Sequence, residues 1–345
     1  MPIASRTALA VLAATLLLSA CGSENASSGR EGREGGESDG GPVRAEALCP
    51  SDFARYGSPP SSESSARPSG TPTALPLPSV NGVSEDGVKV TALYAWGPKS
   101  GCAGVDNSAD FEITNQQKET ATYTLTFGFL SASGGAVDNA EQTVEAIGPG
   151  RTVKGTVVVG ERVGNAPEVT GVKVIKVRSV PEAEASSASG ACPESGMHLY
   201  ADEGDAAMGL RAVGLHLVNC GTRPMRLNGY PKLTIQDEDH RPVDGVRILQ
   251  GTDQISTGLG GDSGPQPVVL RPGEAAVAGL AWRNTTQSGE PVNAPYVRVW
   301  AEPAADPVMV VPELDLGTTG KLGVGAWRKD ETHRDSAGGT AAGRP

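Results

Sequence analysis

Four residues in the second half of the chain, Gly261-Asp262-Ser263-Gly264, have the types and spacing of a serine nucleophile held in a glycine-rich loop. Such a serine attacks a carbonyl carbon only when a histidine accepts its proton and N–H groups stabilise the oxyanion that forms. The first chemistry to test is therefore hydrolysis by Ser263.

The surroundings of Ser263 do not complete a hydrolase. Trypsin-like proteases carry Gly-Asp-Ser-Gly-Gly-Pro, whereas here Pro265 follows the second glycine directly, so one glycine of the oxyanion loop is missing. None of the upstream histidines, His198, His216 and His240, lies in the Thr-Ala-Ala-His-Cys-like stretch of those enzymes. The chain also has no Gly-x-Ser-x-Gly elbow and no Ser-x-x-Lys pair. We predict that the protein is not an enzyme, with a serine hydrolase using Ser263 as the alternative.

Other groups that could carry chemistry have plainer explanations. The acidic stretches 202–205 and 237–240 offer oxygen ligands for Ca²⁺, but neither has the spacing of an EF-hand loop, and acidic residues are common in turns. The cysteines show no zinc-ligand spacing. Trp282, Trp300 and Trp327 either form an aromatic binding platform or pack in a core. We predict no metal and no cofactor.

The N-terminus predicts export and a lipid anchor. Arg6 precedes an apolar run of about 12 residues from Thr7 to Leu18, which is shorter than the roughly 20 residues needed to span a bilayer, so residues 1–20 are interpreted as a signal peptide. Leu18-Ser19-Ala20-Cys21 resembles a bacterial lipobox, which implies a diacylglyceryl group on Cys21. Two acyl chains are enough for stable anchoring. The expected location is the outer face of the cytoplasmic membrane, with the membrane as a partner through Cys21.

Cysteine parity supports this interpretation. Of the five cysteines, lipidation of Cys21 leaves four, which can pair in three ways. Linking Cys49 to Cys102 and Cys192 to Cys220 is the pairing that keeps each bridge within one half of the chain, and we predict it. In the chain-entropy model, bridges closing loops of about 54 and 29 residues each stabilise the fold by about 3.5 to 4 kcal/mol.

Composition divides the chain and excludes one class of partner. The net charge of −11 disfavours nucleic acid. Gly, Ser and Glu dominate the predicted lipidated flexible tether, and Pro and Ser dominate the spacer that follows it. The expected segments after the signal peptide are the tether 21–48, the spacer 49–83, a first domain 84–180, a linker 181–190, a second domain 191–328 and a disordered tail 329–345.

Both domains are predicted to be β-sandwiches. Between Thr122 and Leu130, the residues Tyr123, Leu125, Phe127 and Phe129 alternate with small or hydroxylated residues, the period of a strand with one buried face. Similar runs recur between Gly and Pro turns, and no stretch shows helical periodicity with caps. The expected fold class is all-β, with two sandwiches in tandem.

The two domains are distant copies of one plan, and the second copy is longer. Each copy has a strand that ends in asparagine, at Asn115 and Asn219, and a later Pro-Gly pair that opens another strand. Pro149 lies 34 positions after Asn115, whereas Pro272 lies 53 positions after Asn219, so the second copy has about 19 additional residues. We interpret residues 246–267 as an inserted loop. Because loops on rigid scaffolds often carry recognition, this loop is a possible binding site through its polar residues. Those residues are Asp253, Gln254, Ser256, Asp262 and Ser263.

The second domain resembles a known family. Its stretches NCGTRPMRLNGYPKLTIQD, VVLRPGEAAVAGLAW and VRVW are similar to domain-of-unknown-function family 4232, a module of actinobacterial lipoproteins and secreted proteins. The resemblance implies an immunoglobulin-like sandwich outside the membrane and no established chemistry. We therefore expect a non-catalytic lipoprotein that binds an unknown protein or envelope glycan, or alternatively a structural or inhibitory accessory lipoprotein of the envelope.

Overall fold

The structure is a computed structural model that describes residues 47–50, 69–77, 84–97, 99–102, 104–160, 164–186, 190–259 and 264–333. It confirms the all-β fold class: these residues form strands β1 to β24 and one 3₁₀ turn, η1 (Glu182–Glu184), with no α-helix among them. No helix in this part of the chain is long and apolar enough to cross a membrane. The predicted signal peptide and Cys21 lie outside the described residues.

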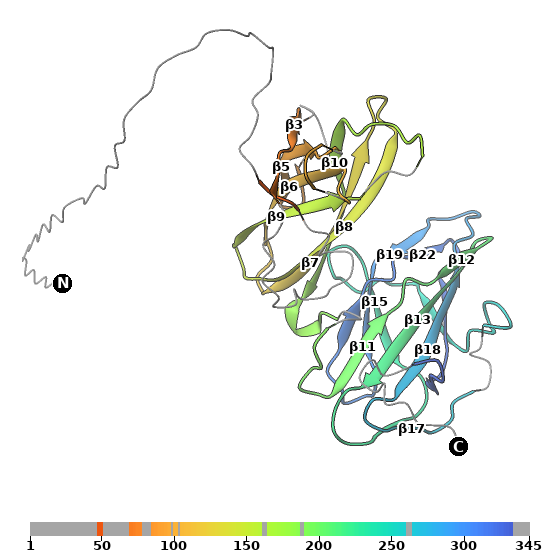
Figure 1. The fold of residues 1–345 in the computed structure, drawn as a ribbon. Helices are drawn as coiled ribbons and strands as arrows, with labels where there is room; N and C mark the ends of the chain where they lie inside the picture. The colour runs from red at the N-terminus through yellow and green to blue at the C-terminus, as the bar shows by residue number, and fades with distance from the viewer. Residues whose placement is uncertain are drawn as a thin grey trace, which may run out of the picture. The chain divides into compact units, whose positions relative to one another are not determined.

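The first sandwich has two antiparallel sheets (Figure 1). One sheet has the order β3–β5–β6–β9, with β4 also paired to β5, and the other has the order β10–β7–β8. Their bounds are β3 (Thr73–Leu75), β4 (Ser84–Glu85), β5 (Val88–Ala95), β6 (Asn107–Thr114), β7 (Ala121–Leu130), β8 (Ala136–Ile147), β9 (Thr152–Val159) and β10 (Gly171–Pro181).

The alternating residues of β7 build the first core, as its period of two predicts. Tyr123, Leu125, Phe127 and Phe129 are buried, and the ring of Phe127 lies 5.0 Å from that of Phe111 on the facing sheet. Aromatic side chains bury large apolar areas, so this group dominates the packing energy of the first sandwich.

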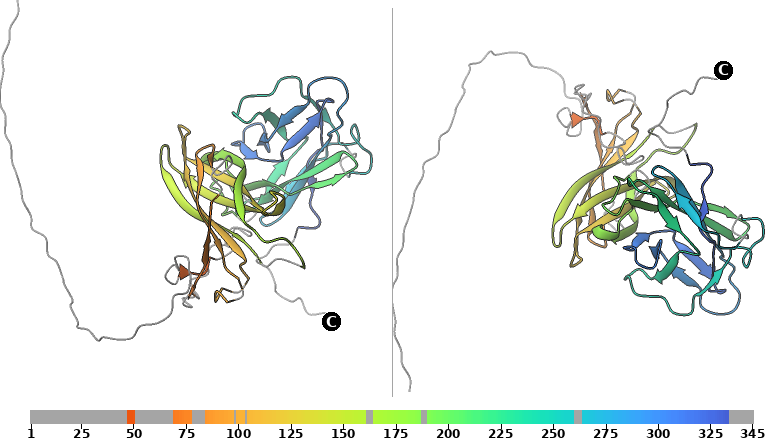
Figure 2. Two further views of the ribbon diagram at one scale, coloured as in Figure 1. Left: turned by 90° about the horizontal axis from the view of Figure 1, so that it is seen from above. Right: turned by 90° about the horizontal axis from the view of Figure 1, so that it is seen from below.

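The second sandwich is also a pair of layers (Figures 1 and 2). One layer has the order β11–β13–β18–β23–β16, with β12 on β13 and β24 on β18, and the other contains β15–β20–β21 and the short ladders β14–β17 and β19–β22. The first layer comprises β11 (Met197–Ala201), β12 (Asp205–Ala207), β13 (Leu210–Asn219), β16 (Arg247–Gln250), β18 (Ala275–Arg283), β23 (Lys321–Val324) and β24 (Arg328–Lys329). The second comprises β14 (Met225–Leu227), β15 (Lys232–Gln236), β17 (Val268–Leu270), β19 (Val292–Ala294), β20 (Tyr296–Trp300), β21 (Val308–Val310) and β22 (Leu314–Gly317).

Two of the tryptophans are core residues of the second sandwich. Trp282 and Trp327 are fully buried between the layers, so they pack in the core and do not form a binding platform. Trp300 remains partly accessible, and the ammonium group of Lys232 lies 4.9 Å from its ring centroid.

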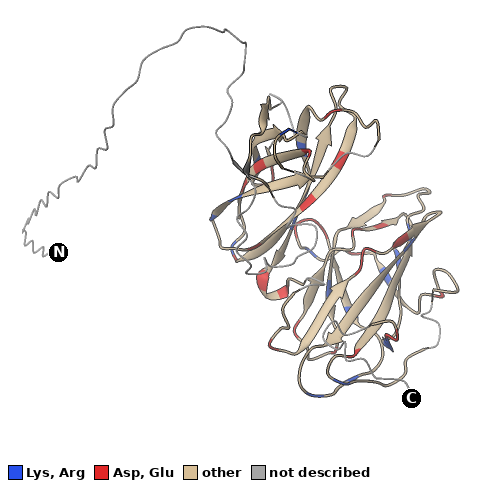
Figure 3. Cartoon of the chain, in the orientation of Figure 1, with Lys and Arg blue, Asp and Glu red and all other residues tan. Residues whose placement is uncertain are grey.

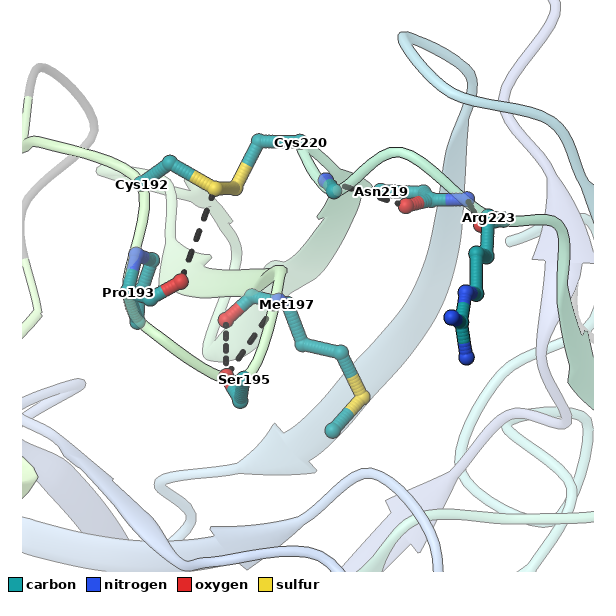
Figure 4. The surroundings of a disulfide bond; sticks show 8 residues. Cys192, Pro193, Ser195, Met197, Asn219, Cys220 and Arg223 are labelled. Atoms are coloured by element: carbon teal, nitrogen blue, oxygen red, sulfur yellow. Dashed lines mark hydrogen bonds between the residues drawn. A yellow bond between two sulfur atoms is a disulfide. The ribbon is translucent and has the colours of Figure 1, made fainter.

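A buried asparagine closes one corner of the second sandwich. The Nδ2 group of Asn219 donates to the carbonyl oxygens of Arg223 and Leu270, both at 2.9 Å, while its Oδ1 accepts the N–H of Gly221 at 3.2 Å. The N–H of Gly273 donates to the carbonyl oxygen of Asn219 at 2.7 Å. One side chain therefore holds the end of β13, the loop after it and the end of β17 together (Figure 4).

The first sandwich has the same corner at Asn115. Its Nδ2 group donates to the carbonyl oxygens of Glu119 and Ile147, at 2.8 and 2.6 Å, and the N–H of Gly150 donates to its carbonyl oxygen at 2.8 Å. Here Oδ1 also accepts the hydroxyl of Tyr123 at 2.8 Å. The N–H of Gln117 donates to the same Oδ1 at 2.7 Å, so all four bonds of the Asn219 network recur at Asn115, which supports the internal repeat inferred from the sequence.

Both predicted disulfides are present. Cys49 is joined to Cys102 and Cys192 to Cys220 (Figure 4), with S–S distances of 2.00 and 2.06 Å. The first bridge holds β1 (Ala47–Leu48), which pairs with β2 (Ser69–Gly70), against the first sandwich. A side chain at Gly70 would overlap the carbonyl oxygen of Ser100 and the Sγ of Cys102, so this contact requires glycine.

Two predicted boundaries were wrong. The spacer 49–83 is not wholly irregular, because β3 pairs with β5 and extends the first sheet. The tail was placed at 329–345, but Lys329 belongs to β24, which pairs with β18, and the described chain continues to His333. Strands of two or three residues carry too few alternating positions to be visible in the sequence.

Candidate functional site

The predicted binding loop 246–267 is only partly a loop, which corrects the sequence-based interpretation. Its residues 247–250 form β16, which pairs in parallel with β23 at the edge of the larger layer. The next residues fold back over that layer: Thr252 is 1% exposed, and side chains at Gly279 and Gly323 would contact Thr252 and Ile255. This half of the insertion is therefore structural.

The structure describes three of the five polar residues proposed for this loop, Asp253, Gln254 and Ser256, and these three do not form a site. Asp253 and Gln254 are exposed at the turn after β16. Ser256 is half-buried, and its N–H donates to the carbonyl oxygen of Thr252 at 3.0 Å. Asp262 and Ser263 lie outside the described residues, so their placement stays a prediction.

His216, which was considered as a catalytic base, lies between two carboxylates. Its Nε2 is 3.1 Å from Asp202 Oδ2, its Nδ1 is 3.4 Å from Asp330 Oδ2, and its ring stacks on Tyr200 with centroids 5.2 Å apart. Within the described chain neither ring nitrogen is hydrogen-bonded to a hydroxyl. The ring thereby joins β13 to the C-terminal segment and to the turn after β11, which is a structural role.

Two neighbours of His216 have shifted pKa values. Burial raises the pKa of the Asp330 carboxyl, but hydrogen bonds from Thr332 and the charge of His216 outweigh burial and lower the pKa below its ordinary value. Burial and the carboxylates of Asp330 and Asp202 raise the pKa of Tyr200. The cluster therefore favours an ionised Asp330 and a neutral Tyr200.

The end of β10 contacts the second sandwich through a compact set of bonds. The N–H of Ser179 donates to the hydroxyl of Tyr296 at 3.0 Å, and Nε2 of His240 lies 2.8 Å from the carbonyl oxygen of Ser179. Because a carbonyl only accepts, this contact requires a proton on Nε2. Val180 packs on Tyr296 and Met309 beside these bonds. The two sandwiches thus share a small core of their own.

A cavity of about 620 Å³ lies next to this contact. Arg178 of β10 lines one side, and residues 237–239, 293–295 and 313–315 of the second sandwich line the rest. The lining of this cavity comes from both sandwiches, and it is our candidate functional site.

Arg178 is the central charge of the cavity. Its Nε and Nη2 groups donate to the two carboxylate oxygens of Glu313 at 2.8 and 3.0 Å, and its Nη2 lies 3.6 Å from Glu238. Burial lowers the pKa of Arg178, but the bonds and charge of Glu313 raise it by more. The arginine is therefore a fixed cation held by a two-pronged ion pair.

The remaining carboxylates of the cavity are also engaged. Asp315 accepts hydrogen bonds from Trp282 Nε1 at 2.6 Å and Asn284 Nδ2 at 3.1 Å, and lies 3.3 Å from an Arg211 nitrogen. Asp237 accepts the N–H groups of Asp239 and Arg241. No group of three or more metal-ligating side chains occurs among the described residues. The lining is polar and has one cation, Arg178, against five acidic side chains, which suits a neutral or cationic polar ligand.

Sequence reasoning missed this cavity. Arg178 and Glu313 are 135 positions apart, and neither belongs to a recognisable motif. The available signal was weak: Arg178 lies in a valine-rich run that also contains Lys173 and Lys176, and the sequence does not distinguish it from these two lysines, a residue type that is usually exposed.

The fold and site define an all-β protein of two sandwiches with a charged cavity where they meet. Residues 192–328 match the family model described as domain of unknown function (DUF4232). This match covers the second sandwich and agrees with the resemblance seen in the sequence, whereas the first sandwich lies outside it. A search of curated proteins finds no match to the chain.

Proposed function

We propose that the protein is a non-catalytic lipoprotein, anchored on the outer face of the cytoplasmic membrane, that binds a protein or glycan of the envelope. The observation that carries the proposal is the order of features along the chain. A lipobox-like sequence ending at Cys21 is followed by a polar tether, and Cys49, bonded to Cys102, marks the start of the folded part.

The bonded cysteines support export. Disulfides persist in oxidising compartments outside the cytosol and are rare inside it. Four cysteines form two bridges here, which leaves Cys21 as the odd residue. That parity is expected when the remaining cysteine carries a lipid.

The partners of His216 and His240 favour a binding function over catalysis. His216 faces two carboxylates, and His240 bonds to the backbone of Ser179. Neither is placed as a base for a hydroxyl in the described chain. The cavity lined by Arg178 and Glu313, by contrast, is concave and lies between two rigid sandwiches, and the bonds between these two side chains hold its polar groups in place. We propose an immunoglobulin-like arrangement for the two sandwiches; the family resemblance that implies it covers the second sandwich.

A matched pair of variants tests the anchor. Cys21→Ala is expected to block lipidation and signal-peptide removal, because the lipid is attached to that thiol. The control, Cys49→Ala with Cys102→Ala, removes a disulfide but leaves the lipobox intact, so its lipidation should be unchanged. A Cys21→Ala product that is cleaved normally would contradict the lipobox. Saturable labelling of Ser263 by a fluorophosphonate would favour the hydrolase alternative instead.

A further inference from the structure

Three exposed arginines gather around the Asn219 corner of the second sandwich. Arg223, Arg226 and Arg271, here called the arginine corner, follow β13, lie on β14 and follow β17 respectively. Figure 4 shows the side chain of Arg223 extending away from the corner, and Figure 3 shows basic residues in the loops at this end of the sandwich.

The backbone bonds bring these residues close to one another. The amide of Asn219 holds the carbonyl oxygens of Arg223 and Leu270, the residue before Arg271. Arg226 is directly opposite Val269, two positions before Arg271. Diagonal neighbours of this kind are about 7 to 8 Å apart on an antiparallel ladder. The arginine corner is therefore a compact cationic surface.

The three charges are not needed by the corner itself. In the matching corner of the first sandwich, the equivalent positions carry Glu119, Thr122 and Gly148, and the asparagine network is intact. None of the three arginines forms an ion pair within the described chain, although the net charge of the protein is −11. The carboxylate of Glu274, near Arg271, is already bonded to Lys329 and to the Arg271 N–H.

An apolar groove begins at Arg226. This cavity of about 450 Å³ is lined chiefly by Leu227, Pro267, Val268, Val269, Pro303 and Ala304, with the carboxylate of Glu302 on one wall. Val269 is one of the few large apolar side chains that are exposed in the described chain, at 45%. Along the β14–β17 ladder, the surface thus combines the cations Arg226 and Arg271 with the exposed side chain of Val269 and the apolar groove.

We propose that the arginine corner and the apolar groove bind an extended acidic segment of a partner polypeptide. Residues on one face of an extended chain recur about every 6.6 Å, close to the diagonal spacing of Arg226 and Arg271. Two acidic side chains therefore pair with the arginines, and an apolar side chain two positions further enters the groove. The inference rests on the proposed binding function and specifies the class of partner.

Other anionic partners fit less well. A phosphate polymer satisfies the arginines but makes no use of the apolar groove. A nucleic acid would in addition be repelled by the excess of acidic residues elsewhere on the chain. The alternation of anionic and apolar groups on one face is a property of polypeptides.

The test measures fluorescence anisotropy of a labelled peptide, Gly-Glu-Ser-Glu-Ser-Leu-Ser-Gly, with the full chain. Saturable binding is expected, weakened by added salt. A variant that carries the residues of the first corner, Arg223→Glu, Arg226→Thr and Arg271→Gly, should bind at least tenfold more weakly. A control with the same loss of charge at three other exposed arginines should change affinity less than twofold. The control changes are Arg283→Glu, Arg247→Thr and Arg151→Gly.

A second variant tests the groove separately. Val269→Ser should weaken binding of the leucine peptide and leave a peptide with serine in place of leucine unaffected. No saturable binding, equal binding by the two triple variants, or tighter binding of polyphosphate than of the peptide would each overturn the proposal. These results leave lipidation at Cys21 untouched, so failure of this inference is distinguishable from failure of the proposed function.

Discussion

Replacing Asn219 with alanine should strongly destabilise the second sandwich. The side chain is 1% exposed and forms three hydrogen bonds, to the carbonyl oxygens of Arg223 and Leu270 and from the N–H of Gly221. Alanine removes all three bonds and leaves the Leu270 carbonyl buried without this donor.

The size of this destabilisation depends on how deeply the groups that lose their hydrogen bond to Asn219 are buried. A hydrogen bond contributes about 1 kcal/mol net, and a buried group left unsatisfied costs about 1 to 3 kcal/mol. Two part-buried bonds and one buried bond therefore predict a loss of about 3 to 5 kcal/mol in the free energy of unfolding. Asn115→Ala should destabilise the first sandwich at least as much, because Tyr123 loses a partner as well.

Guanidinium unfolding with the disulfides intact measures this loss. The fluorescence of Trp282, Trp300 and Trp327 reports on the second sandwich, whereas Trp96 reports on the first. Hydrogen exchange measured on peptides then shows which of the two sandwiches is destabilised. The matched control is Asn228→Ala, which changes an exposed asparagine directly after β14. It should change the free energy of unfolding by less than about 0.5 kcal/mol.

A small effect of Asn219→Ala would contradict this prediction. If Asn219→Ala lowers the free energy of unfolding by less than about 1 kcal/mol, water or a shifted loop satisfies the freed carbonyls, and the corner does not hold the two strands. If the loss appears equally in the first sandwich, the two networks are not independent.

Three further changes test the other sites. Arg178→Ala should lower the free energy of unfolding by about 1.5 to 3 kcal/mol, because it removes the two-pronged bond to Glu313; Arg178→Lys should restore only part of this in the same denaturant titration. The folded pKa of Asp330 is lowered, so its stabilisation is present above about pH 3.9 and is lost as the pH falls through the folded pKa. When urea midpoints are measured from pH 2 to 7, the midpoint should therefore fall less steeply toward low pH in Asp330→Asn than in the unchanged protein. The exposed Asp253→Asn is the matched control. Ser263→Ala should leave fluorophosphonate labelling at background; labelling that disappears in this variant would contradict a non-catalytic loop.

Much of the fold was visible in the sequence because its signals are local. The alternation from Tyr123 to Phe129 identified a half-buried strand, and the recurrence of Asn115 and Asn219 before Pro-Gly pairs identified the repeat. Cysteine parity left three possible pairings, and the rule that each bridge stays within one half of the chain predicted both disulfides. Each of these inferences needs only residue type and spacing.

The features that were missed depend on pairing between distant segments. β16 is four residues long and becomes a strand because β23, more than 70 positions later, offers a parallel edge. Nothing in its own sequence distinguishes it from a loop. The bond between Arg178 and Glu313 likewise exists only once both sandwiches have folded.

The intact mass of the protein extracted from membranes with detergent shows whether the chain is cleaved, lipidated and disulfide-bonded. We expect a chain of residues 21–345 that carries a diacylglyceryl group on Cys21 and lacks the four thiol hydrogens lost in forming two disulfides. A full-length mass with free thiols, or a cleaved chain without lipid, would contradict a surface-anchored module.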